Sequence, residues 1–274
     1  MKKVLGLQQC RESSAFISNR INGIPKVGII LGSGLGGLVD EIENQICVPY
    51  TETPHFPVST VEGHKGELIF GFLEGNPVIA MAGRFHFYEG YEMSDVIFPI
   101  RVMKILGTEK LIVTNAAGGL NPDFEVGDLM LIEDIISLLP ANPLIGVNEE
   151  ELGPRFPDMS EPFDSDWSQR IKLKANEMQI GLKSGTYIGV TGPSLETKAE
   201  INYFRIIGGD AVGMSTVPEV IAANHLGMKV LGISVITNES IPKVTKEFSH
   251  AEVVQVANES GKKLVTLIKK VVKG

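Results

Sequence analysis

The feature that most limits the possible folds is a glycine-rich turn between two apolar segments. Residues 27–31 predict a buried strand, residues 32–37 contain four glycines and Ser33, and residues 38–42 predict a helix. A strand that turns into a helix through glycines exposes backbone N–H groups at the helix N-terminus, where the helix dipole favours an anion. The stretch therefore predicts a phosphate or carboxylate site, and a tight turn without a ligand is the alternative.

The same glycines match a second pattern in their spacing. Gly32, Gly34 and Gly37 fit the fingerprint of dinucleotide-binding folds, which also need an acidic residue about 20 positions further on, at the end of a second strand. Glu52 lies at this distance, but two prolines follow it and no second strand–helix unit is visible. The Gly-Lys-Ser/Thr ending of a P-loop is absent too. The glycines alone leave the ligand open.

Composition limits the class of protein. The chain has 274 residues, of which 43% are hydrophobic and 21% charged, and no linker or repeat divides it, so we predict one domain over residues 1–274. A net charge of −8 argues against a nucleic-acid partner, although local donors can still bind a small anion. Cys10 and Cys47 lack the spacing of a metal or disulfide framework, and no apolar run reaches the roughly 18 residues of a membrane span. We expect a cytoplasmic protein without a membrane partner.

Strand and helix patterns alternate along the chain. After a leading helix within residues 1–24 and the glycine turn, a hairpin is predicted at residues 67–72 and 77–82. Further strands are predicted at residues 110–114, 128–132, 184–190, 210–213 and 229–237, and further helices at 94–106, 166–177, 197–207, 217–226 and 249–273. Residues 139–164, rich in proline and asparagine, predict a long surface loop. The alternation predicts an α/β fold with a central mixed β-sheet flanked by helices.

Glycine-rich or polar residues follow five of the predicted strands. They lie at Ser33 and its glycines, 83–90, 115–119, 213–219 and 237–239. In sheets of this class, ligands bind where strands end and helices begin, so five such ends predict a shared pocket.

Two of these strand ends carry groups that suit an anion. Arg84, His86 and Tyr88 point the same way if residues 84–88 are extended, and a guanidinium beside an imidazole suits phosphate. The alternative is a solvated arginine with a structural histidine. Ser215 precedes a predicted helix whose start, residues 216–219, fits a capping box with proline in the first turn.

Three further candidates lie at helix starts or in turns. Glu196 precedes a possible capping box and could accept hydrogen bonds from a ligand, or be a surface acid that the helix dipole favours. His250 lies in the first turn of the last helix, within a third possible box, and His64 lies in a polar turn. We interpret His55 and His225 as structural. The sequence shows no metal cluster, paired-carboxylate pattern or nucleophile elbow.

Taken together, these segments resemble the trimeric purine nucleoside phosphorylases. The resemblance covers nearly the whole chain from Gly28 onward, and residues 83–90, 114–119, 192–200 and 212–219 occur in the family's order. Members of this family cleave a purine nucleoside with phosphate and release the free base and ribose 1-phosphate. The resemblance implies a pentosyltransferase of purine salvage that needs no cofactor or metal.

The resemblance also implies a role for each candidate residue. Phosphate would be held by Ser33, Arg84, His86, the backbone of Ala116 and Ser215, with His64 above it in a mobile loop. Tyr88 and Met214 would contact the ribose, Glu196 and Asn238 the base, and His250 the 5′-hydroxyl. Phe156 would cover the sugar in the neighbouring subunit's site, which makes a homotrimer necessary. The catalytic residues would be Asn238, Glu196 and His86.

The residue types at the base end favour 6-oxopurines, in ribonucleosides or deoxyribonucleosides. Asn238 can donate to N7 of the leaving purine and accept from it once N7 is protonated, and Glu196 can accept from N1–H of hypoxanthine or guanine. Leu195 stands where the family usually has an aromatic residue, Glu239 follows Asn238, and residues 239–249 differ in length from some members. The alternatives are a methylthioadenosine phosphorylase, whose family has aspartate in place of Asn238, a xanthosine phosphorylase, and a nucleotide-binding module without catalysis.

Overall fold

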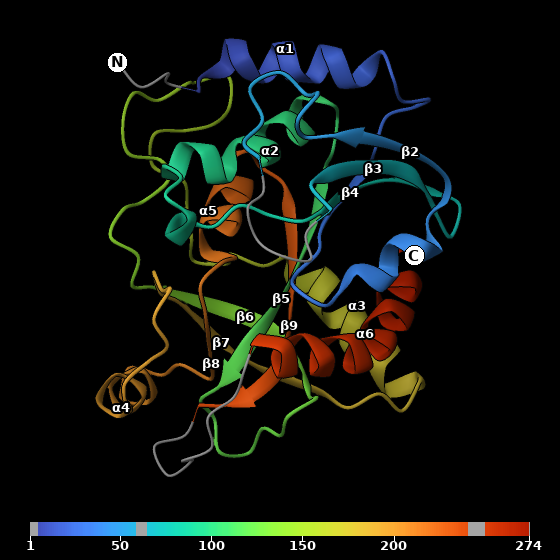
Figure 1. Ribbon diagram of the computed structural model, residues 1–274. Helices are drawn as coiled ribbons and strands as arrows, with labels where there is room; N and C mark the ends of the chain where they lie inside the picture. The colour runs from blue at the N-terminus through green and yellow to red at the C-terminus, as the bar shows by residue number, and fades with distance from the viewer. Residues whose placement is uncertain (1–4, 59–64, 241–249, 274) are drawn as a thin grey trace.

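The fold is built on one mixed sheet. The computed structural model describes residues 5–58, 65–240 and 250–273, and within them nine strands are arranged in the order β2-β3-β4-β1-β5-β8-β7-β6-β9 (Figure 1). The strands are β1 (Val27–Ile30), β2 (Glu43–Pro49), β3 (Glu67–Leu73), β4 (Asn76–Ala82), β5 (Lys110–Gly119), β6 (Leu129–Ser137), β7 (Leu182–Gly189), β8 (Ala211–Gly213) and β9 (Lys229–Glu239). Both parallel and antiparallel pairs occur, so the predicted mixed α/β fold is confirmed.

The sheet closes on itself at one end. β9 pairs with β6 and also in parallel with β5, so β5, β8, β7, β6 and β9 form a ring, while β1 to β4 extend from β5 as an open sheet. The sequence patterns did not predict this ring, because apolar periodicity shows which residues are buried but not which strands pair. The closure places the ends of β5, β8 and β9 next to one another.

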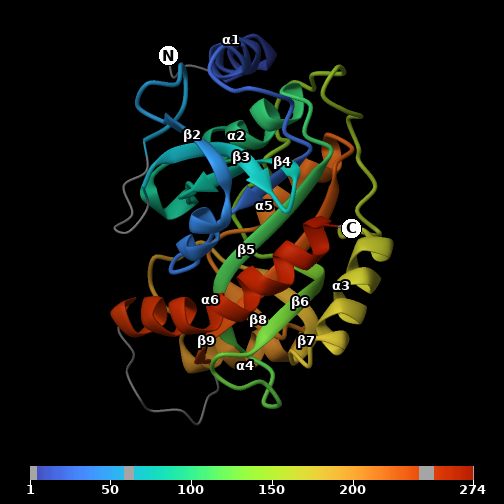
Figure 2. The same cartoon turned by 90° about the vertical axis from the view of Figure 1, so that its right-hand side faces the viewer.

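Helices cover both faces of the sheet (Figures 1 and 2). They are α1 (Leu7–Ser18), α2 (Met93–Ile105), α3 (Ser165–Glu177), α4 (Lys198–Ile206), α5 (Val217–His225) and α6 (His250–Lys273), with short 3₁₀ helices η1 (Gly36–Glu41) and η2 (Phe87–Glu89). Alternate strand residues enter two separate cores: Leu111 and Val113 pack with residues of α1, α2 and α5, whereas Ile112 packs with residues of α3 and α6. This alternation is the period of two expected for a strand buried on both faces.

Most predicted elements are found within a few residues of their expected bounds, but two predictions need correction and one strand was missed. The strand predicted at 110–114 continues to Gly119, because β9 and β8 pair with it on either side. The helix predicted at 38–42 is the 3₁₀ helix η1, and the chain then enters β2, which the sequence patterns missed. Residues 139–164, predicted to be a long loop, contain neither helix nor strand. In the described ranges, no helix combines the length and the apolar character that crossing a membrane requires.

Candidate functional site

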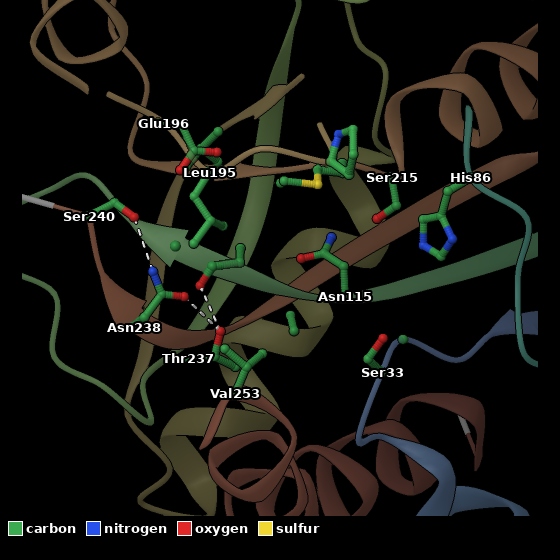
Figure 3. Close-up of a pocket in the computed structure, with 18 of the residues that line it drawn as sticks. Ser33, His86, Asn115, Leu195, Glu196, Ser215, Thr237, Asn238, Ser240 and Val253 are labelled. Carbon is green, nitrogen blue, oxygen red and sulfur yellow. Dashed lines mark hydrogen bonds between the residues drawn. The ribbon is translucent and has the colours of Figure 1, made fainter. Parts of the chain in front are cut away.

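A pocket of about 410 Å³ lies where the ends of β1, β5, β8 and β9 meet, a volume within the usual range for small-molecule sites (Figure 3). It brings together most of the predicted site residues, which are Ser33, Arg84, His86, Tyr88, Ala116, Glu196, Met214, Ser215 and Asn238. In Figure 3, Ser33, His86 and Ser215 lie toward one end, and Asn238, Glu196 and Leu195 lie toward the other. The predicted shared pocket is therefore present, although residues 115–119 and 237–239 belong to strands rather than following them.

The cationic end of the pocket is built around Arg84, whose side chain is almost fully buried. Its Nη1 donates to Thr216 Oγ1 at 3.2 Å and lies 3.7 Å from Glu219 Oε1, and its Nη2 donates to the carbonyl oxygen of Thr114. Burying an arginine is costly unless the charge is paired, and Glu219, itself 2% exposed, supplies the opposite charge. The guanidinium is thus held in one place at the wall of the pocket.

The turn before α5 differs from the predicted capping box. Thr216 has φ 70° and ψ −52°, and the N–H of Val217 donates to the carbonyl oxygen of Ser215 at 2.7 Å, which is the geometry of a strained γ-turn. Its hydroxyl does not cap the helix but accepts from Arg84 and from Asn115 Nδ2, at 2.9 Å for Asn115. The capping-box prediction is therefore wrong, because the side chains of Thr216 and Glu219 contact Arg84 in the pocket wall and do not cap α5.

Asn115 is a member of this wall that the sequence singled out only as part of a strand end. It is 2% exposed and lines the pocket, and its Oδ1 has no hydrogen-bond partner among the described residues. An unsatisfied buried acceptor carries a desolvation cost of about 1–3 kcal/mol, which a ligand that donates a hydrogen bond could remove.

His86 is fixed by a neighbour that the sequence analysis missed. Glu89 Oε1 lies 2.8 Å from both the backbone nitrogen and Nδ1 of His86. The imidazole also stacks on Tyr88, with ring centroids 4.8 Å apart, because Phe87–Glu89 form the 3₁₀ helix η2 instead of the extended chain we expected. Burial, followed by the charge of Glu89, raises the pKa of Tyr88 to about 12, so its phenol stays protonated and able to donate. In the sequence, the spacing of three residues between His86 and Glu89 was the signal that could have indicated this contact.

The glycine turn packs closely against two neighbouring elements. The N–H of Gly32 donates to Thr114 Oγ1 at 3.2 Å, and a Cβ at Gly32 would lie 2.7 Å from the Cα of Asn115. Gly34, at φ 74°, approaches α6 so closely that a Cβ would lie 2.6 Å from the Cβ of Ala257. Since no α-helix follows, the argument from a helix dipole fails, and these glycines allow close packing while Ser33 lines the pocket.

The other end of the pocket carries Asn238 and Glu196. Thr237 Oγ1 donates to Asn238 Oδ1 and Asn238 Nδ2 donates to Ser240 Oγ, both at 3.1 Å. Burial raises the pKa of Glu196, and the nearby charge of Glu200 raises it further. Leu195 lines the same end and is 55% exposed. Ser240 and Val253 also line the pocket, and no sequence pattern identified them. Thr216, which the sequence pattern assigned to a helix cap, belongs to the pocket wall.

Three predicted site residues are not placed in this pocket. Phe156 lies on the surface with 87% of its area exposed, beside a second hollow that Arg155 and Ile145 also line. His64 lies outside the described residues, and so does the side chain of His250, the first residue of α6. The part of the chain that the structure describes holds no group of three or more metal-ligating side chains.

The fold and the pocket define an α/β protein with a buried cation and polar hydrogen-bonding groups in one cavity, and the chain belongs to the phosphorylase superfamily. A sequence model of that superfamily matches residues 26–273. Within it, the chain belongs to the purine nucleoside phosphorylases. It is 55% identical over 260 residues to purine nucleoside phosphorylase 1 of Bacillus subtilis, covering 95% of this chain and 96% of that one. It is 50% identical to the purine nucleoside phosphorylase of Bos taurus, over 93% and 90% of the two chains.

Solved structures show the same relationship. The Schistosoma mansoni purine nucleoside phosphorylase in complex with hypoxanthine superposes with a TM-score of 0.93 at 38% sequence identity, covering 98% of this chain and 97% of that one. Isoform 2 from the same organism, in complex with cytosine and ribose 1-phosphate, gives a TM-score of 0.95 at 40% identity over 100% and 98% of the chains.

Proposed function

We propose that this protein cleaves 6-oxopurine nucleosides, such as inosine and guanosine, with inorganic phosphate. The observation that carries the proposal is the pocket itself, in which a buried, charge-paired arginine and a set of base-reading side chains line one cavity. Phosphate bound by Arg84, Ser215, Ser33, His86 and the backbone of Ala116 would attack C1′ of the sugar. The products are the free base and ribose or deoxyribose 1-phosphate, and no cofactor takes part.

The chemistry places different demands on the two ends of the pocket. As the bond from C1′ to N9 breaks, positive charge develops on the sugar, and the phosphate is at once nucleophile and counter-charge. The electron pair of the broken bond goes to the purine, which needs a hydrogen bond or a proton at N7. Asn238 would supply that stabilisation, and ionised Glu196 would accept from N1–H, which adenine lacks.

The remaining assignments are proposals of the same kind. Tyr88 and Met214 would contact the ribose from within the pocket, His250 would meet the 5′-hydroxyl, and His64 would lie over the phosphate. We also propose that residues 1–274 form one nucleoside phosphorylase domain and that the protein is a cytoplasmic homotrimer. Cys10 and Cys47 are both free thiols, and Phe156 is exposed on an irregular surface segment where a second subunit could cover it.

The test is release of hypoxanthine from inosine with and without phosphate. We expect release only when phosphate is present, with ribose 1-phosphate formed in equal amount. A panel of inosine, guanosine, xanthosine, adenosine and methylthioadenosine then defines the base. Turnover of methylthioadenosine but not of inosine would contradict the proposed substrate, and release without phosphate would contradict the proposed reaction.

A further inference from the structure

The carboxamide of Asn238 is held at both ends by hydroxyl groups, one from Thr237 in β9 and one from Ser240 just after it. Thr237 Oγ1 donates to Oδ1 and Nδ2 donates to Ser240 Oγ, both at 3.1 Å (Figure 3). Each hydroxyl can donate or accept, and Thr237 Oγ1 also lies 3.4 Å from the carbonyl oxygen of Ala117, so the two contacts fix where the carboxamide lies and not which of its ends carries the nitrogen. With only one of the two contacts, the carboxamide would be freer to rotate away from this position.

Ser240 is itself fixed by the neighbouring strand. It is 5% exposed, and its backbone N–H donates to the carbonyl oxygen of Gly119 in β5 at 2.8 Å. Its hydroxyl lies against Gly118, where a Cβ would clash with Ser240 Oγ and lie 3.1 Å from Asn238 Nδ2. The absence of a side chain at Gly118 therefore makes room for the contact between Ser240 and Asn238.

The position of this amide matters for the release of the base. The edge of a 6-oxopurine presents two acceptors, O6 and N7, as long as N7 is unprotonated. When the departing base takes up a proton at N7, the edge becomes an acceptor beside a donor, which pairs with an amide N–H and an amide oxygen. A carboxamide held beside this edge can make both hydrogen bonds, and the pair matches the departing base better than the bound nucleoside, which is the condition for raising kcat.

We propose that Ser240 is a positioning residue, whose hydroxyl holds the Asn238 carboxamide in the place from which it supports departure of a 6-oxopurine. The inference rests on the proposed function, because it concerns the leaving group of that reaction. Ser240 acts through Asn238 and need not touch the substrate. Its effect should therefore depend on whether the leaving base needs help at N7.

The test compares inosine with 7-methylguanosine in Ser240→Ala. The methyl group gives the base of 7-methylguanosine a positive charge and occupies N7, so this base leaves without a proton there. We expect kcat for inosine to fall roughly tenfold, as for the loss of one hydrogen bond, while kcat for 7-methylguanosine stays within about twofold of the wild type. Ser240→Thr, which keeps the hydroxyl, should restore most of the inosine rate.

Controls separate positioning from packing. Ser234→Ala removes a different buried hydroxyl, one that lies in β9 and has no hydrogen-bond partner among the described residues, and should leave both rates unchanged. Equal losses on both substrates in Ser240→Ala, or no loss on inosine, would overturn the inference. Should Ser240→Ala fail to fold, Ser240→Cys, with a similar shape and a weak hydrogen-bonding group, takes its place with the same expected selectivity. A wild-type protein inactive on inosine and phosphate overturns the proposed function and this inference with it, whereas an active wild type with an unaffected Ser240→Ala overturns only the inference.

Discussion

At the scale of single residues, the most unusual feature is Thr216. A β-branched residue with positive φ is strained, and backbone strain of this kind costs on the order of 1–3 kcal/mol. The side chain of Thr216 is fully buried. Its hydroxyl accepts hydrogen bonds from Arg84 and Asn115 and lies 3.2 Å from Ser215 Oγ. The strained turn thus connects three groups that line the proposed phosphate site.

We predict that Thr216→Ala raises KM for phosphate by roughly tenfold, the effect expected for losing one shared hydrogen-bond acceptor in a buried site. KM for inosine should change much less, because Thr216 contacts the cationic end of the pocket. Thr216→Ser keeps the hydroxyl and is the matched control, with near wild-type KM for phosphate. Steady-state kinetics with each substrate varied in turn would measure both values, and an equal rise in the two KM values would contradict this role.

Glu196 gives a prediction about pH. Burial raises its pKa, so on acidification Glu196 takes up a proton at a higher pH than an exposed glutamate, whose pKa is about 4.3. Only the ionised carboxylate can accept from N1–H of the base, so kcat/KM for inosine should fall on the acid side above the ordinary carboxyl range. Glu196→Gln should have a lower kcat/KM and lack this acid limb.

The same shift predicts the effect on stability. A raised pKa means that the folded state disfavours the charged form, so ionised Glu196 opposes folding at neutral pH and this cost disappears as the pH falls through its folded pKa. Glu196→Gln should therefore keep or raise the Tm at neutral pH while it loses activity. A lower Tm would indicate that the side chain has a structural role.

At the scale of elements, the glycines of the turn after β1 differ in how closely they approach the rest of the protein. Gly32 lies against the backbone of β5, whereas a Cβ at Gly36 would meet nothing within 4 Å. We predict that Gly32→Ala destabilises the fold by about 1–3 kcal/mol, as for overpacking, and that Gly36→Ala has little effect. Chemical denaturation of the two variants measures the difference. Equal free energies of unfolding for the two variants would contradict this prediction and would mean that β1 and β5 can move apart without an energetic cost.

The sequence predicted the positions of most helices and strands, because alternating and helical apolar patterns are local. The register and pairing of strands are not local, so the ring that closes where β9 pairs with β5 could not be predicted. For the same reason, Arg84, Ser215 and Asn238 were identified as candidates from their strand ends, while Thr216 was interpreted as a helix cap and Ser240 was not identified. The roles of Thr216 and Ser240 depend on contacts between segments that lie far apart in the chain, or on a tight turn within one segment.

At the scale of the whole molecule, an irregular surface segment exposes apolar side chains that one chain does not cover. Ile145, Val147 and Phe156 are 74%, 95% and 87% exposed, and all three lie within residues 138–164, which form neither helix nor strand. Arg155 Nη1 donates to the carbonyl oxygens of Leu144 and Gly146, both at 3.0 Å, so this segment is held in place by its own hydrogen bonds. An ordered, apolar surface of this kind suits contact with another subunit.

A mixing experiment tests whether Phe156 completes the pocket of a neighbouring subunit. Phe156→Ala keeps its own Asn238, and Asn238→Ala keeps its own Phe156, so each homo-oligomer has only defective sites. If Phe156 acts on a neighbour, a mixed oligomer contains some sites with both residues intact. We therefore expect chains unfolded and refolded together, or co-expressed, to turn over inosine faster than the sum of the two variants assembled separately. If Phe156 instead acts on its own subunit, mixing gains nothing, because each chain still carries its own defect; if it acts on no site, Phe156→Ala alone is as active as the wild type. Light scattering of the wild type, with a mass of three chains expected, decides independently whether an assembly exists in which one subunit could reach the next.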